Sequence, residues 1–193
     1  STDYIPDMIA IIGEMIPSFR KDGDGYVFSY TGIGYEWVEK LRRRGEKVLF
    51  LSPIPRGSIG KKICDELTEM GVVYDPDMLV SVNPPVKIDD EYIIRSSSMF
   101  TIDTEKLTDA FSYFSDIKSV VVSSAVLSAN PSASAVLDAL SFLSPLPEIA
   151  VDKSLPEEEI VNNDILERTL NGFMAIPGCL ITDDKEEILN KIS

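Results

Sequence analysis

Histidine is absent from all 193 residues of the chain. Without histidine, the chain cannot build a Ser-His-Asp triad, a Cys-His pair or most of the zinc sites known in proteins. Any acid–base chemistry would depend on carboxylates, lysine, tyrosine and serine. Several classes of hydrolase and metalloenzyme are therefore excluded before any motif is considered.

Cysteine and long apolar segments are also scarce. Cys64 and Cys179 lie far apart in the sequence, which fits a reducing compartment better than a disulfide framework. We interpret both as thiols buried in the core. No apolar run reaches the roughly 20 residues of a membrane span, and the N-terminus lacks the basic and apolar segments of an export signal. The sequence therefore predicts a cytoplasmic protein without membrane contact.

Basic residues are outnumbered, with 18 Lys and Arg against 32 Asp and Glu and a formal charge of −14. This charge opposes binding to nucleic acid and to anionic membranes, so neither is expected as a partner. The one basic cluster, 42–44, ends a predicted helix, where cations oppose the negative end of the helix dipole. We interpret it as a solvated helix end rather than a phosphate site.

Apolar residues make up 44% of the chain, enough for one substantial core, so we expect a single domain over residues 1–193. Short apolar runs alternate with segments of helical periodicity. Predicted strands are 8–13, 47–52, 72–74, 119–123, 148–152 and 179–182, and predicted helices are 35–44, 58–70, 104–114, 131–143, 157–170 and 183–192. This alternation predicts an α/β protein with a parallel sheet.

Two segments depart from this rhythm. Ile16 to Tyr30 contains the turn Lys21-Asp22-Gly23-Asp24-Gly25, whose Asp and Gly residues favour the conformations of a hairpin turn. The segment 85–95 alternates apolar and polar residues around a second acidic turn. We expect lid strands within 16–31 and 85–96, which form a small β-sheet projecting from the main one.

Three short motifs look like ligand-binding loops but lack essential members. The acidic turn 22–25 has Ile33 where a calcium loop needs its final Glu. The segment 57–62 has Pro55 where a P-loop needs its first Gly, and no Ser or Thr after the Gly-Lys pair. Gly32-Ile33-Gly34 lacks the third Gly of a dinucleotide fingerprint. Each motif is better explained by a local backbone requirement.

Asp152 ends a predicted buried strand, at the edge where open α/β sheets place their ligands. A contact with a ligand fits this position. A capping role for the helix that follows fits it as well.

Several segments lie in the order found in one family of enzymes. They are Gly13-Glu14 after the first strand, the glycine turn and helix within 30–45, the segment 54–67 with G-K-K-I-C-D-E-L at 60–67, and Gly71-Val72. Over nearly the whole chain this order resembles the ribokinase, or PfkB, family of carbohydrate kinases. The resemblance implies a Rossmann-like three-layer sandwich with a mostly parallel sheet and a small β lid that covers a sugar and often pairs subunits.

Most of the family's polar site residues are changed. The family's sugar-contacting Asp aligns with Ser18, and its sugar-binding Asn aligns with Glu36. Its Gly-Gly pair aligns with Thr31-Gly32. The Gly-Asp-Asp of the second signature aligns with 55–57, and the strand-end Asp-Pro-Asn aligns with 152–154. Only the Asp of the last motif is kept, as Asp152. The family's Gly-Ala-Gly-Asp motif, which supplies the anion hole and the general base, does not occur in these 193 residues.

The resemblance still implies a cleft for a small polar ligand such as a sugar. Its candidate binding residues are Ser18, Gly32, Gly34, Glu36, Arg95 from the lid, and Asp152. Each has a structural alternative. The two glycines can simply permit the turn, and Glu36 can oppose the positive end of its helix.

The leading hypothesis is a truncated, degenerate ribokinase-like protein without kinase activity, catalytic residues, metal or cofactor. It would act as a ligand-binding or assembly module, and its lid would favour a homodimer. The alternative is a genuine sugar kinase that uses ATP and Mg²⁺, with its nucleotide-binding half on another polypeptide or outside this sequence. A third hypothesis is a structural partner of an intact kinase.

Overall fold

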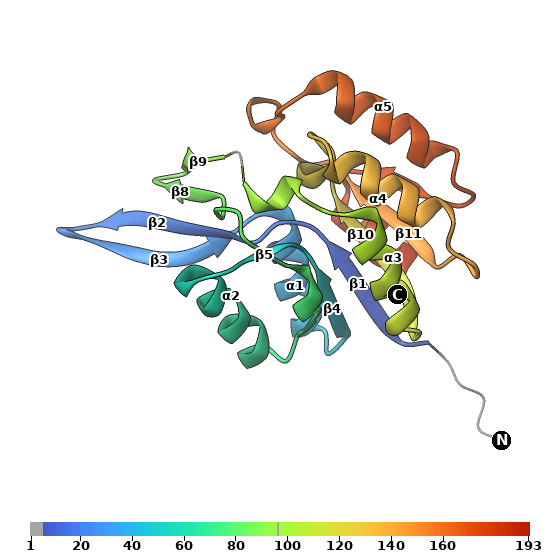
Figure 1. The fold of residues 1–193 in the computed structure, drawn as a ribbon, viewed down its shortest axis with the longest axis horizontal. Helices are drawn as coiled ribbons and strands as arrows, with labels where there is room; N and C mark the ends of the chain where they lie inside the picture. The colour runs from blue at the N-terminus through green and yellow to red at the C-terminus, as the bar shows by residue number, and fades with distance from the viewer. Residues whose placement is uncertain (1–5, 96) are drawn as a thin grey trace.

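The structure, a computed structural model, describes residues 6–95 and 97–193. Its centre is a six-stranded sheet in the order β12-β11-β10-β1-β4-β6, in which the pairings are parallel (Figure 1). The strands are β1 Met8–Ile12, β4 Lys47–Leu51, β6 Val73–Tyr74, β10 Ile117–Ser123, β11 Glu148–Asp152 and β12 Leu180–Thr182. The structure confirms the α/β fold expected from the alternation of strands and helices.

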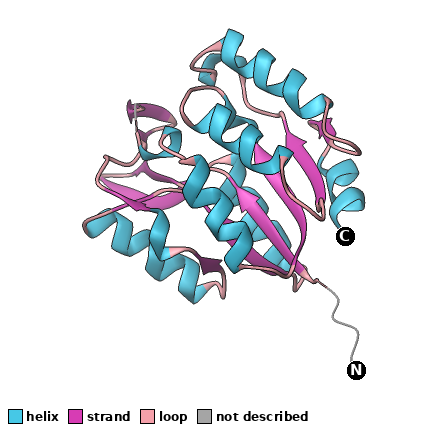
Figure 2. Cartoon of the chain, turned by 45° about the vertical axis from the view of Figure 1, so that its right-hand side comes forward, coloured by secondary structure: helices cyan, strands magenta, loops and turns pink. Residues whose placement is uncertain are grey.

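Helices cover both faces of this sheet (Figure 2). One face packs against α1 Ile33–Arg43, α2 Ser58–Glu69 and α6 Lys185–Ile192, and the other against α3 Thr104–Tyr113, α4 Ser132–Ser141 and α5 Asn163–Met174. Successive residues of β1 alternate between the two layers: Ile9 and Ile11 join the first core, Ala10 and Ile12 the second. Burial on both faces explains why this strand is a continuous apolar run.

The lid is a second, mixed sheet in the order β3-β2-β8-β9. Its strands are β2 Ile16–Asp22, β3 Gly25–Thr31, β8 Val86–Ile88 and β9 Glu91–Ile94. Strands β2 and β3 extend well beyond the main sheet, on the left of Figure 1. A further two-stranded sheet pairs β5 Ile54–Pro55 with β7 Leu79–Val80. Residue 96, at the end of the predicted lid segment, lies outside the described residues.

Two predicted helix boundaries are wrong. The expected helix 157–170 is instead a short 3₁₀ turn, Glu157–Glu159, followed by α5 from Asn163. The side chain of Asn162 accepts a hydrogen bond from the backbone N–H of Ile165 at 3.0 Å, so α5 begins at Asn163, six residues later than predicted. At α4 the helix begins at Ser132 with Pro131 in the capping position, while the Asn130 Oδ1 accepts a hydrogen bond from the backbone N–H of Ser134 at 3.1 Å.

The two cysteines also differ from expectation. Cys64 and Cys179 are both half-buried rather than enclosed in the core. Burial raises the pKa of the Cys179 thiol to about 11, so this side chain is a neutral thiol at physiological pH.

The strand order reverses between β1 and β10. From β1 the chain proceeds to β4 and β6 on one side, and from β10 to β11 and β12 on the other. In open α/β sheets, ligands bind at the carboxyl ends of the strands beside such a reversal. The residues that follow β1, β10 and β11 therefore define the place to look for a site.

Candidate functional site

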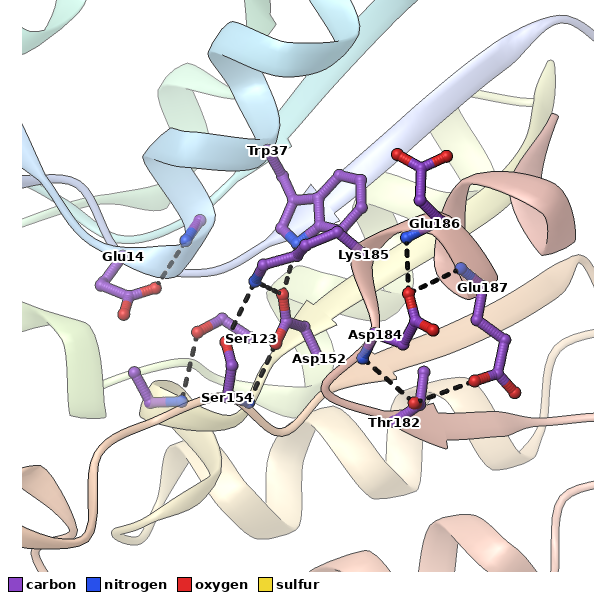
Figure 3. Close-up of polar contacts among 12 residues, drawn as sticks. Glu14, Trp37, Ser123, Asp152, Ser154, Thr182, Asp184, Lys185, Glu186 and Glu187 are labelled. Atoms are coloured by element: carbon purple, nitrogen blue, oxygen red, sulfur yellow. Dashed lines mark hydrogen bonds and ion pairs between the residues drawn. The ribbon is translucent and has the colours of Figure 1, made fainter.

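Glu14 follows β1 and lies at the reversal point. Its side chain is only 2% exposed, and its carboxylate Oε1 accepts a hydrogen bond from the backbone N–H of Gly34 at 2.8 Å (Figure 3). Burial raises the pKa of the Glu14 carboxyl, although hydrogen bonds from the backbone of Gly34 and the side chain of Ser123 act in the opposite direction. The first turn of α1 thus binds a carboxylate from the chain itself.

Gly32 and Gly34 make this arrangement possible. Gly32 has φ of 117°, and a Cβ atom there would lie 2.8 Å from the Glu14 Cγ. A Cβ atom at Gly34 would lie 2.6 Å from the Glu14 backbone nitrogen. Both glycines therefore allow the helix to approach the end of β1 closely. Glu14 itself was not among the predicted site residues, although the Gly-Glu pair after the first strand was visible in the sequence.

Asp152, at the end of β11, forms a second polar cluster. It is fully buried, and its Oδ2 accepts a hydrogen bond from the Trp37 Nε1 at 2.7 Å and pairs with the Lys185 ammonium (Figure 3). Its Oδ1 accepts from the backbone N–H of Ser154 at 2.9 Å. Two of these donors come from helices, Trp37 from α1 and Lys185 from α6.

Electrostatics keeps this carboxylate charged. Burial alone would raise the pKa of Asp152, but hydrogen bonds from Lys185, Ser154 and Trp37 outweigh burial and lower it. The Lys185 ammonium also lies 5.6 Å from the centre of the Trp37 ring and donates to the Ser154 Oγ at 3.0 Å. Asp152 therefore joins three elements across the carboxyl edge of the sheet.

Ser18 and Arg95 have partners outside these clusters, whereas Glu36 lies beside the Asp152 cluster. The Ser18 hydroxyl is buried within the first lid hairpin, 2.8 Å from the Thr31 Oγ1. Arg95 donates to the backbone carbonyl of Glu159. Glu36 is exposed in the first turn of α1 and lines a groove of about 230 Å³ together with Lys185 and residues of α1. Binding of a ligand by these residues stays a prediction.

The region after β4 is tightly packed. A cavity there, lined by Ser52, Pro55, Pro84 and neighbouring residues, has a volume of only about 10 Å³. A single water needs roughly 10–15 Å³ of such volume, so this cavity cannot hold a sugar as it stands. Among residues 6–95 and 97–193, no group of three Asp, Glu or Cys side chains is placed to hold a metal ion.

The sequence matches no family model and no curated protein. Its fold, however, is similar to those of solved carbohydrate kinases. An aminoimidazole riboside kinase from Salmonella enterica superimposes with a TM-score of 0.71 at 14% identity, over 90% of this chain and 59% of that one. A putative 2-keto-3-deoxygluconate kinase from Enterococcus faecalis gives 0.74 at 11% identity, over 95% and 60%.

A fructokinase from Xylella fastidiosa gives a TM-score of 0.69 at 16% identity, over 87% of this chain and 58% of that kinase. The chain therefore has the ribokinase-like fold that its motif order predicted. It spans about three fifths of the length of these kinases. Within the described residues, no helix is long and apolar enough to cross a membrane.

Proposed function

We propose that this chain is a ribokinase-like module that does not itself transfer phosphate and that assembles through its lid. One observation carries the proposal: the polar groups at the carboxyl edge of the sheet bind one another. The Glu14 carboxylate accepts a hydrogen bond from the N–H of Gly34. The Asp152 carboxylate accepts one from Trp37 and forms an ion pair with Lys185. A substrate would have to replace these contacts rather than complete them.

The requirements of phosphoryl transfer support the same proposal. The reaction depends on positioning and on charge stabilisation at the phosphates. In the family that the sequence resembles, a Gly-Ala-Gly-Asp motif provides both, and this motif is not found in the 193 residues. The altered residues Ser18 and Glu36 would also change the contacts to a sugar, since a carboxylate cannot donate as an amide does.

The surface of the lid supports assembly into a homodimer. Tyr26 and Val27 on β3 are 57% and 51% exposed, and Ile93 on β9 is 58% exposed. Strand β3 pairs with β2 on one side only, so its other edge is open to a further strand. Exposed apolar side chains on an open strand are typical of a surface that pairs with another copy.

A thermal-shift panel of sugars, nucleosides and ATP with Mg²⁺ tests the catalytic part of the proposal. We expect no stabilisation by ATP and no sugar-dependent release of ADP. A shift with a sugar or nucleoside alone would support a ligand-binding role for the cleft that Ser18, Gly32, Gly34, Glu36, Arg95 and Asp152 were predicted to line. Stabilisation by ATP together with sugar-dependent ADP release would overturn the proposal.

A second candidate function is that of a genuine sugar kinase whose nucleotide-binding part lies on another polypeptide or outside these residues. The observation that favours it is coverage, because the solved aminoimidazole riboside kinase superimposes on 90% of this chain while 59% of its own length is matched. Sugar-dependent ADP release by the complete gene product, or by this chain mixed with a co-purifying kinase, would establish it. If ADP release is unchanged when this chain is left out of the mixture, the chain takes no part in catalysis and is a structural partner of the kinase.

A further inference from the structure

The second lid hairpin is joined to the main domain by one well-formed ion pair. The Lys87 ammonium, on β8, lies 2.6 Å from the Glu159 carboxylate, which belongs to the 3₁₀ turn after β11. The two side chains are only 13% and 23% exposed. Solvent and salt therefore screen this pair less than the exposed pair between Arg20 and Asp90 within the lid.

Two further lid residues contact the same place. Arg95 donates a hydrogen bond to the backbone carbonyl of Glu159. The ring of Tyr92, on β9, contacts both cations: its centre is 4.5 Å from the Lys87 ammonium and 5.4 Å from the Arg95 guanidinium. Both sides of the hairpin are thus held by one residue of the main domain.

Tyr92 also connects this contact to the carboxyl edge of the sheet. Burial raises the pKa of its hydroxyl, and the negative charges of Glu14 and Glu159 raise it further. The hydroxyl is therefore within electrostatic reach of Glu14, at the reversal point of the strand order. Glu159 itself follows β11 at this same edge, in the 3₁₀ turn 157–159.

We propose that Glu159 is a latch, which holds the hairpin of β8 and β9 closed over the carboxyl edge of the sheet. Closure is then set by a residue of the chain itself and does not wait for a ligand. Opening requires the loss of the Lys87 pair and of the Arg95 contact, and it exposes more of the half-buried Tyr92. The contact consists of one ion pair and one hydrogen bond, so the latch holds the hairpin without fixing it permanently.

Amide hydrogen exchange of the whole chain tests the latch. Glu159→Gln removes the charge while keeping the shape, and Glu158→Gln is the matched control, because Glu158 lies in the same turn and is exposed. We expect Glu159→Gln to speed exchange in residues 86–94 about fivefold, and Glu158→Gln to leave it unchanged. Exchange in the core strands β1 and β10 should stay the same in both variants.

Two more variants keep the test decisive if Glu159→Gln perturbs its own turn. Lys87→Gln should produce the same local increase from the lid side, and the exchanged pair Lys87→Glu with Glu159→Lys should restore much of the protection. Equal exchange in Glu159→Gln and Glu158→Gln, or no restoration by the exchanged pair, would overturn the latch. These measurements are made at a protein concentration too low for a dimer to form, so their outcome does not depend on assembly. Hydrogen exchange also does not depend on catalysis.

Discussion

Gly60, in the first turn of α2, lies against the backbone carbonyl of Pro55, and a Cβ atom at this position would overlap the carbonyl oxygen. This contact explains why the glycine of the second family signature stays while the acidic pair beside it does not. Packing requires the glycine, whereas no such backbone contact requires an acidic pair at Arg56 and Gly57. The sequence at 54–67 is therefore evidence for the fold rather than for catalysis.

Substituting Gly60 by alanine tests this distinction. Because the obstacle is a backbone atom, the helix must shift, and we expect the free energy of unfolding to fall by about 3 kcal/mol. Urea denaturation measures the change. Gly25→Ala is the matched control, since a Cβ atom there meets nothing within 4 Å. Equal effects of the two substitutions would contradict a packing role for Gly60.

Asp152 gives a pH-dependent prediction at the same scale. Its pKa in the folded chain is lowered, so its ionised form contributes stability above the ordinary Asp pKa, and this stability is lost as the pH falls through the folded value. Asp152→Asn should therefore lower the free energy of unfolding by about 3 kcal/mol at pH 7, because Lys185 loses its partner. The difference from the unsubstituted chain should shrink in acid.

Denaturation curves from pH 7 down to pH 3 measure that difference. The control is Asp138→Asn on α4, where no ion pair is described. A difference that stays constant with pH would show that shape, and not charge, makes Asp152 important.

At the scale of elements, sequence periodicity predicted most helices and strands but not where α5 begins. The three glutamates at 157–159 have high helix propensity and suggested an early start. The Asn162 cap, which competes locally with that propensity, sets the real boundary. The sequence contains this signal, but an Asn can cap a helix, form a turn or lie on a surface, and only the tertiary context decides.

Removing the cap of α5 should therefore weaken one helix without altering the sheet. Asn162→Ala leaves the N–H of Ile165 without its side-chain acceptor, and we expect a loss of about 1 kcal/mol in unfolding free energy. Asn171→Ala, at an exposed position inside the same helix, should be neutral or slightly stabilising. Thermal denaturation of both variants compares them directly, and a larger loss at Asn171 would contradict the assignment.

At the scale of the whole molecule, the fold could be predicted because it depends on repeated local patterns, whereas the site depends on single long-range contacts. Lys185 is 33 residues from Asp152, and Glu159 is 72 residues from Lys87. No pattern in the sequence specifies such pairs in so acidic a chain. The family resemblance implied that Arg95 reaches a ligand from the lid, and its contact with Glu159 appears only in three dimensions.

Assembly through the lid is the prediction that concerns the whole molecule. Val27 on β3 of the lid and Val73 on β6 of the main sheet are both exposed valines on edge strands, at 51% and 41%. If the lid pairs two copies, Val27→Lys buries a charge in the interface and should weaken the dimer by about 2 kcal/mol. Val73→Lys should have no effect, because β6 lies in the main sheet. Sedimentation equilibrium over a range of concentrations measures the dimer affinity of both variants. A chain that stays monomeric throughout, or a dimer weakened only by Val73→Lys, would contradict pairing through the lid.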